Sequence, residues 1–268
     1  MAYDGTDFSG WQVQPGRSTV QGALASAIGR LTGENVLPQG SGRTDAGVHA
    51  LAQVASFETN SSIPEANWIG ALNDILPASI RVLQVGEAEP EFHARKSARA
   101  KTYRYRILSA AICPPFLARY VWHYPYPLDE AVMVEAAGVV VGEHDFSSFA
   151  AVDPERVERL AAEETGGETN LQMGGARTIN ARTINVRATN VRTIFSSEWK
   201  REGDELIYTA RGSGFLHNMV RNLVGTFLLI GKGAVSVDGL RVILEARERT
   251  AAGPTAPAGG LYLVNVEY

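Results

Sequence analysis

The chain has 268 residues, a hydrophobic content of 45% and a formal net charge of −4. This length can bury one large core or two smaller ones, while the single cysteine, Cys113, excludes an internal disulfide framework and a thiolate zinc cluster. The acidic balance argues against a nucleic-acid-binding protein, and we expect a reducing, cytoplasmic location.

The first hundred or so residues combine helical and strand patterns. Ser18-Thr19-Val20-Gln21 resembles a capping box that opens a helix, and Gly33 is placed to end it. Further elements are predicted as a strand at Leu51–Phe57, a helix from Pro64 through Trp68, Leu72 and Ile75, a strand at Ile80–Val85 and a strand at Lys101–Leu108. In the last strand Tyr103, Tyr105 and Ile107 alternate with Thr102, Arg104 and Arg106, which indicates two different faces.

Pro114 and Pro115 interrupt the pattern, and we expect a domain boundary near residue 109. An N-terminal α+β subdomain would span residues 1–108 and a C-terminal α+β subdomain residues 109–268. The second is predicted to contain a helix at Asp129–Val141, a loop at His144–Phe149, strands at Val191–Lys200 and Glu205–Arg211, helices at Phe215–Ile230 and Val237–Ala246, and a final strand at Gly260–Tyr268. The predicted fold is α+β, with two similar α/β subdomains sharing a largely antiparallel central sheet flanked by helices.

Residues 176–195 form a five-residue near-repeat that reads ARTIN, ARTIN, VRATN, VRTIF. A period of five matches neither a strand nor a helix. With the polar stretch before it, this segment is predicted to be a loop or a disordered insertion at about 152–190. Its arginines could add phosphate contacts, but a neutral expansion is the favoured interpretation.

Basic residues are concentrated in two segments despite the negative total. His93–Arg106 has six basic residues and no acid, and Gly175–Arg201 has six against Glu198 alone. Local potential attracts a polyanion whatever the total charge, although a solvated charged surface explains either run equally well. No signal peptide is apparent at the start of the sequence. The longest apolar stretch, Phe215–Ile230, is too short and too polar to span a membrane.

The stretch Gln39–Ala50, QGSGRTDAGVHA, has the most informative composition. Glycines surround Arg43, Thr44 and Asp45, so the backbone can turn tightly and present a polar side chain. The spacing fits neither a Walker-type phosphate loop nor a dinucleotide fingerprint. An ordinary hairpin with a charged tip is the simpler alternative. Asp45 and His49 could suggest a metal pair, but no third ligand with suitable spacing is evident.

Two other segments have chemical potential. In Lys101–Tyr105 aromatic and basic residues alternate, so a tyrosine could stack on an unpaired base while cations hold phosphates; a half-buried strand is the alternative. Arg221 lies within an apolar helical pattern, where a guanidinium needs an anionic partner or solvent. Asp45 is the natural candidate for that partner, and snorkelling to the surface is equally good locally.

Together these segments resemble the bacterial-type tRNA pseudouridine synthase A family, whose members have a pseudouridine synthase-like fold. The resemblance begins at Ala2–Pro15 and covers nearly the whole chain except about Val152–Asn190. It is carried by GRTDAGVHA (Gly42–Ala50), ARAKTYRYRI (Ala98–Ile107), HDFSSF (His144–Phe149), VRTIF (Val191–Phe195), GFLHNMVRNLVG (Gly214–Gly225) and GLYLVNVEY (Gly260–Tyr268), in the family's order. The first strand looks shortened relative to the family.

The resemblance implies a role for each site residue. Asp45 would be the nucleophile and Arg221 its ion-pair partner. Tyr103 would pack against the target uracil and later help proton removal, Arg43 would occupy the flipped nucleotide's place or hold the phosphate backbone, and Leu261 would close the base pocket. The family acts without metal or organic cofactor. Its members are homodimers that bind tRNA across both subunits and modify the anticodon stem-loop near positions 38 to 40.

The expected reaction fits these residue types. Breaking an N-glycosidic bond, turning the base and rejoining it through carbon needs an ionised carboxylate, which can trap the sugar or add to the base. The sequence does not choose between these routes. An adjacent arginine favours the ionised form, and an apolar pocket excludes water. The rival functions are a non-catalytic RNA-binding module and a metal-dependent hydrolase built on Asp45 and His49.

Overall fold

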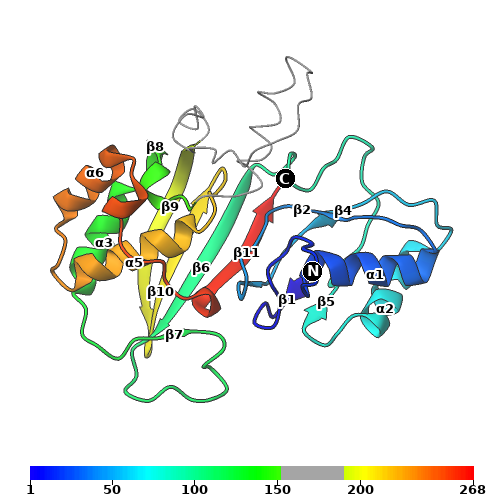
Figure 1. Ribbon diagram of the computed structural model, residues 1–268, viewed down its shortest axis with the longest axis horizontal. Coiled ribbons are helices and arrows are strands. Elements are labelled where there is room, and N and C mark those ends of the chain that lie inside the picture. The colour runs from blue at the N-terminus through cyan, green and yellow to red at the C-terminus, as the bar shows by residue number, and fades with distance from the viewer. Residues whose placement is uncertain (152–189) are drawn as a thin grey trace, which may run out of the picture.

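The computed structural model describes residues 1–151 and 190–268, so the predicted insertion and most of its near-repeat lie outside the described residues. One sheet is built from β1 (Ala2–Tyr3), β3 (His49–Ala50), β5 (Ile80–Arg81), β6 (Ala100–Leu108), β7 (Trp122–His123), β8 (Gly142–Asp145), β9 (Val191–Glu202), β10 (Glu205–Gly212) and β11 (Leu261–Glu267). Its order is β5-β1-β3-β11-β6-β10-β9-β8, with β7 beside β6 (Figure 1). β2 (Gln39–Gly40) and β4 (Ala55–Ser56) form a separate pair.

The strand directions and helices agree with the predicted α+β class. The β11–β3 and β6–β7 pairs are parallel, and the other pairs in the described part are antiparallel. The helices are α1 (Val20–Thr32), α2 (Glu65–Ile75), α3 (Glu130–Val139), α5 (Met219–Gly231) and α6 (Val237–Ala246). In Figure 1, α1 and α2 lie towards the β1–β5 end, and the other three towards the β8–β9 end. Within the described ranges, no helix is both long and apolar enough to cross a membrane.

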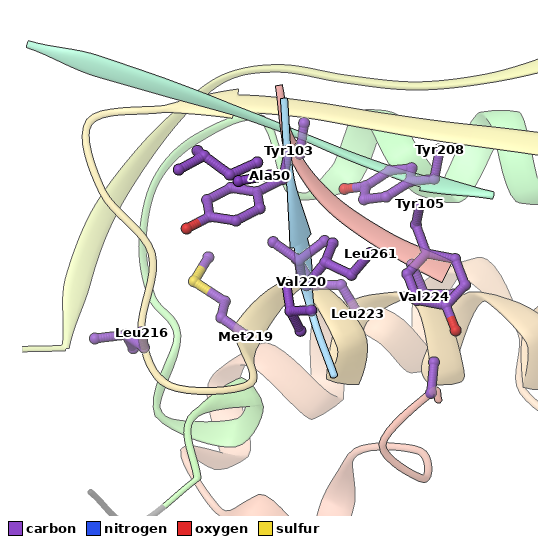
Figure 2. Close-up of a cluster of buried hydrophobic side chains, with 14 of the residues drawn as sticks. Ala50, Tyr103, Tyr105, Tyr208, Leu216, Met219, Val220, Leu223, Val224 and Leu261 are labelled. Atoms are coloured by element: carbon purple, nitrogen blue, oxygen red, sulfur yellow. The ribbon is translucent and has the colours of Figure 1, made fainter. Parts of the chain in front are cut away.

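The centre of the sheet joins the two halves of the sequence. β11, the last strand, lies between β3 and β6 of the first half, and β10 pairs with β6 from Lys101 to Leu108. The sheet therefore continues across the expected boundary near residue 109. Along β6 the predicted alternation is confirmed: Tyr103, Tyr105 and Ile107 are buried. Figure 2 shows two of them, Tyr103 and Tyr105, in one cluster with α5 side chains that include Val220 and Leu223.

Several predicted elements are confirmed closely. α6 has the predicted bounds, β9 and β10 extend slightly beyond theirs, and α1 ends before Gly33. α2 begins directly after Pro64 and buries Trp68 and Leu72. These elements have strong local patterns that agree with their tertiary surroundings.

Other local predictions were wrong. The capping box does not form: Thr19 caps α1 through the Gly22 N–H, while the Gln21 side chain instead accepts from Val13 N and donates to the Pro38 carbonyl. Gln21 is buried, and those tertiary partners replace the local one. α5 begins at Met219 rather than Phe215, because Asn218 has φ 58° and cannot belong to a right-handed helix.

Three further segments differ in their strand content. The strand predicted at Leu51–Phe57 is only Ala55–Ser56, the one predicted at Ile80–Val85 ends at Arg81, and the loop predicted at His144–Phe149 contains the end of β8 and a 3₁₀ turn at Ser147–Phe149. In each case the paired strand limits the length: β4 and β5 pair with the two-residue strands β2 and β1, and β8 ends opposite Val191, the first residue of β9. Short apolar runs do not contain that information.

Candidate active site

Asp45 lies in the turn between β2 and β3, and a second segment of the first half holds this turn in place. The Trp11 N–H donates to the Thr44 carbonyl at 3.0 Å, and the Val48 N–H to the Asp45 carbonyl at 3.1 Å. Gly47 has φ 78°, which a residue with a side chain rarely adopts. At Gly5 an added Cβ would lie 1.9 Å from the Val48 carbonyl oxygen, so only glycine permits this close approach. The backbone of the turn is therefore closely constrained.

A buried polar network also holds the N-terminal side of the same turn. The Gln53 side chain is fully buried, accepts from Ser41 Oγ at 2.6 Å and donates to the Gly42 carbonyl at 2.9 Å. It also contacts the hydroxyl of Tyr3, which shares a 2.8 Å hydrogen bond with Thr44 Oγ1. Burial raises the pKa of Tyr3 to about 12, so its hydroxyl keeps its proton at neutral pH. Ser41, Gly42 and Thr44 are thus fixed on the N-terminal side of Asp45.

Arg221 of α5 lies against Asp45, as the sequence suggested. Its Nη1 is 3.3 Å from Asp45 Oδ2, and the two side chains are 16% and 17% exposed. The same Nη1 donates to Asn218 Oδ1 at 2.7 Å, and Nε donates to the Ala256 carbonyl at 2.7 Å. The guanidinium is therefore oriented by groups from two segments as well as by the carboxylate. Such a mostly buried cation stabilises an ionised carboxylate.

His217 is a site residue that the sequence reasoning missed. Its Nε2 lies 3.3 Å from Asp45 Oδ1, the carboxylate oxygen that Arg221 does not contact. The side chain is 38% exposed and stands on the more open side of the carboxylate. A helix beginning at Phe215 would have placed this residue in an apolar helical segment. The sequence signal was that His217 is followed by an asparagine, a residue type that adopts the left-handed conformation more readily than most, so the helix could begin after it.

Tyr103 lies beside the turn that carries Asp45, since a Cβ added to Gly42 would be 3.5 Å from its hydroxyl. It packs edge-on against Phe215, with ring centroids 4.9 Å apart. Burial, together with the charges of Tyr3 and Asp45, raises the pKa of Tyr103 above its ordinary value, so the hydroxyl stays protonated at neutral pH. Across the sheet Leu263 lies opposite Tyr103, whereas Leu261 lies opposite Tyr105. In Figure 2 Leu261 belongs to the same buried cluster, so it lines the core beside Tyr103 without facing it in the strand register.

The cations expected to accompany Tyr103 point the other way. Arg104 is exposed, and Arg106 forms an ion pair with Glu205 at 2.6 Å. Because alternate residues of a strand face opposite sides, neither shares the face of Tyr103. The half-buried strand with core tyrosines, one of the two interpretations of this segment, is what β6 forms. Lys101, two residues before Tyr103, is the basic residue on its face.

His49 and Arg43 complete the predicted set. His49 is buried; its Nδ1 accepts from the Gly5 N–H at 3.1 Å and lies 3.2 Å from Asp4 Oδ1, and its Nε2 lies 3.1 Å from the Arg119 carbonyl. These contacts make His49 a link between segments. Across the described ranges, no cluster of three or more His, Cys, Asp or Glu side chains could hold a metal ion. Arg43 is half-buried in the turn, two residues before Asp45.

The site is thus a carboxylate contacted on one oxygen by an arginine and on the other by a histidine, beside a buried tyrosine. Comparison with known proteins relates this chain to a family of enzymes. A family model described as tRNA pseudouridine synthase matches residues 1–111 and 176–268. The chain is 46% identical over 268 residues to a tRNA pseudouridine synthase A of Solibacter usitatus, covering 100% of this chain and 97% of the relative.

Two further relatives have the same printed name. A tRNA pseudouridine synthase A of Halalkalibacterium halodurans is 44% identical over 262 residues, which is 97% of this chain and 88% of the relative. One from Bacillus pumilus is 42% identical over 270 residues, which is 100% of this chain and 97% of the relative. The similarity therefore extends over the whole chain.

Proposed function

Since the chain belongs to the tRNA pseudouridine synthase family, an isomerase family, we propose that it converts uridine to pseudouridine in the anticodon stem-loop of tRNA, near positions 38 to 40, with Asp45 as the nucleophile. The observation that supports Asp45 is its contact with both Arg221 and His217. Asp45 is the one carboxylate of the glycine-rich turn, and its partner Arg221 is mostly buried.

The proposed chemistry uses this arrangement directly. The bond between C1′ of the ribose and N1 of the uracil breaks, the base turns, and a new bond forms from C1′ to C5. The proton lost from C5 is balanced by the proton that N1 gains. Asp45 bonds transiently either to the sugar or to the base, and Arg221 holds the carboxylate in position until that step. The buried surroundings of Tyr103 exclude water that would otherwise hydrolyse the separated sugar.

The target uridine has to leave its base stack before it reaches Asp45, which costs a few kcal/mol and favours uridines in loops and at stem ends. We propose that the extruded uracil packs on the ring of Tyr103. We also propose that Leu261 makes the pocket for the uracil apolar. Arg43 is proposed to occupy the vacated position or hold the backbone. Its place in the turn next to Thr44 supports this role.

We further propose that the protein acts in the cytoplasm as a homodimer, with tRNA bound across both subunits and without metal or organic cofactor. The isomerisation conserves atoms and electrons, so it requires no redox partner. Light scattering of the purified protein tests the dimer. Full activity in excess EDTA is expected, and loss of activity that added metal restores would favour the hydrolase-like alternative.

The central experiment maps pseudouridine in tRNA incubated with purified protein. Wild type is expected to modify uridines near positions 38 to 40, and Asp45→Asn to bind the same tRNA without product. Asp238→Asn is the matched control, because Asp238 is 95% exposed on α6. Turnover by Asp45→Asn would reject the nucleophile, and tRNA binding by wild type without any product would favour a non-catalytic RNA-binding module.

A further inference from the structure

Lys101 lies at the turn that carries the nucleophile, and its ammonium is half-buried there. Its Nζ donates to the Ser41 carbonyl, four residues before Asp45. Within the part of the chain that the structure describes, Lys101 donates this one hydrogen bond. An ammonium has three protons to donate. Two donor positions are thus available for another acceptor.

The space beside this ammonium is shared with the tyrosine of the site. A Cβ added to Gly42 would lie 3.7 Å from Lys101 Nζ and 3.5 Å from Tyr103 Oη, with nothing nearer. The backbone of Gly42 therefore lies beside two polar groups of β6, the Lys101 ammonium and the Tyr103 hydroxyl. Since Lys101 and Tyr103 are two residues apart on one strand, their Cα atoms are about 6–7 Å apart on the same face.

Two arginines from different segments add positive charge around Lys101. The charges of Arg95, which follows β5 in the chain, and of Arg192 on β9 both act on Lys101. Arg192 packs on Gly214, next to the Phe215 that contacts Tyr103: an added Cβ on Gly214 would lie 3.6 Å from Arg192 Nε. Gathering like charges is unfavourable, so this region favours an anion.

We propose that Lys101 binds a backbone phosphate of the nucleotide whose base enters the site beside Tyr103. This rests on the proposed function, because it needs an RNA strand at Asp45. An extruded nucleotide brings its own phosphates towards the mouth of the pocket, and the exposed Arg104 and the paired Arg106 are on the other face. Lys101 is thus the basic residue of the Lys101–Tyr105 segment to which we assign the phosphate contact.

The proposed contact couples phosphate binding to the protonation of Lys101. Burial, followed by the charges of Arg95 and Arg192, lowers the pKa of Lys101 to about 8, so half of the free protein is protonated at this lysine at about pH 8. A bound phosphate favours the charged ammonium and raises that pKa again. Binding of tRNA should then take up about half a proton at about pH 8 and almost none near pH 6, where Lys101 is already charged.

The first test measures proton uptake by titration calorimetry in two buffers of different ionisation enthalpy. It uses full-length tRNA and the Asp45→Asn protein, so that no turnover occurs. Lys101→Met in the same background is expected to lose the uptake at about pH 8. Lys101→Arg, which stays charged, should also show no uptake but should bind. Undiminished uptake by Lys101→Met overturns the proposal.

The second test measures affinity against salt concentration. One phosphate contact fewer should reduce the slope of log affinity against log salt by about 0.7 for Lys101→Met, and weaken binding about tenfold near pH 6. Lys200→Met is the matched control, because Lys200 lies near the far end of β9 and is 75% exposed beside Glu202. An unchanged slope, with loss only of kcat, overturns phosphate binding.

These outcomes separate the two proposals. Pseudouridine formation by wild type without Lys101-dependent proton uptake would reject the phosphate contact alone. Uptake that depends on Lys101, with no pseudouridine formed, would reject the catalytic proposal alone.

Discussion

Arg221 and Asp45 are 176 residues apart in the chain, yet Arg221 Nη1 lies 3.3 Å from Asp45 Oδ2. Two other contacts of the guanidinium, with Asn218 and the Ala256 carbonyl, fix its orientation. The carboxylate thus faces a cation that is already positioned. Because such a cation requires no rearrangement during the reaction, it is effective at stabilising charge.

Replacing Arg221 by leucine should lower kcat at least about 100-fold, since the mostly buried carboxylate then lacks its cation. Arg221→Lys should recover only part of this loss, because an ammonium cannot contact all three acceptors in the same geometry. Single-turnover rates of pseudouridine formation measure the effect. Arg241→Leu is the control, since Arg241 is 61% exposed on α6. Wild-type rates in Arg221→Leu would contradict the pairing.

His217 should act by orienting Asp45 through Oδ1. His217→Ala is expected to reduce kcat about tenfold with little change in KM, because the carboxylate loses one of its two partners. His217→Gln retains an N–H donor and should recover most of the rate. His144→Ala is a suitable control, because that ring contacts the Val141 carbonyl away from the site. Equal rates for His217→Ala and wild type would show that His217 does not contribute to the reaction.

Gln53 should stabilise the turn that carries Asp45. Gln53→Leu removes the partners of Ser41 Oγ and the Gly42 carbonyl, and should lower the free energy of unfolding by about 2–5 kcal/mol. Urea denaturation measures this change. Gln39→Leu, at an exposed position, should change stability by less than about 0.5 kcal/mol. Similar values for both variants would show that the network contributes little.

His49 should make stability depend on pH. Burial lowers its pKa below the ordinary value of 6.5, despite the opposing charge of Asp4. The unfolded chain therefore takes up the proton first, so the contribution of His49 is complete above about pH 6.5 and is lost as pH falls through the lowered value. Asp4 also has a lowered pKa, and its contribution disappears only below about pH 3.8.

Denaturation of wild type and His49→Gln at a series of pH values tests this sign. The difference between the two proteins should shrink as pH falls from about 7 to about 5, because glutamine does not titrate and the other histidines contribute equally to both. A difference that stays constant over this interval would contradict the expected shift.

The sequence was sufficient for features that depend on near neighbours in the chain. The alternation of β6 predicted its buried face, and the apolar pattern around Arg221 required an anionic partner or solvent, of which the structure shows the partner Asp45. The ordered motifs predicted the family to which the chain belongs. Each of these is a local pattern, or a charge whose burial would be too costly without a partner.

Only the tertiary structure placed the remaining side chains. His217 meets Asp45 because Asn218 adopts a left-handed conformation that delays the start of α5, and Gln21 leaves its predicted cap for distant partners. β11 lies between β3 and β6, although the last strand follows β6 by more than 150 residues in the sequence. The physical reason is that backbone and polar groups take whichever partners packing brings within reach, and a linear pattern does not specify which distant segment that is.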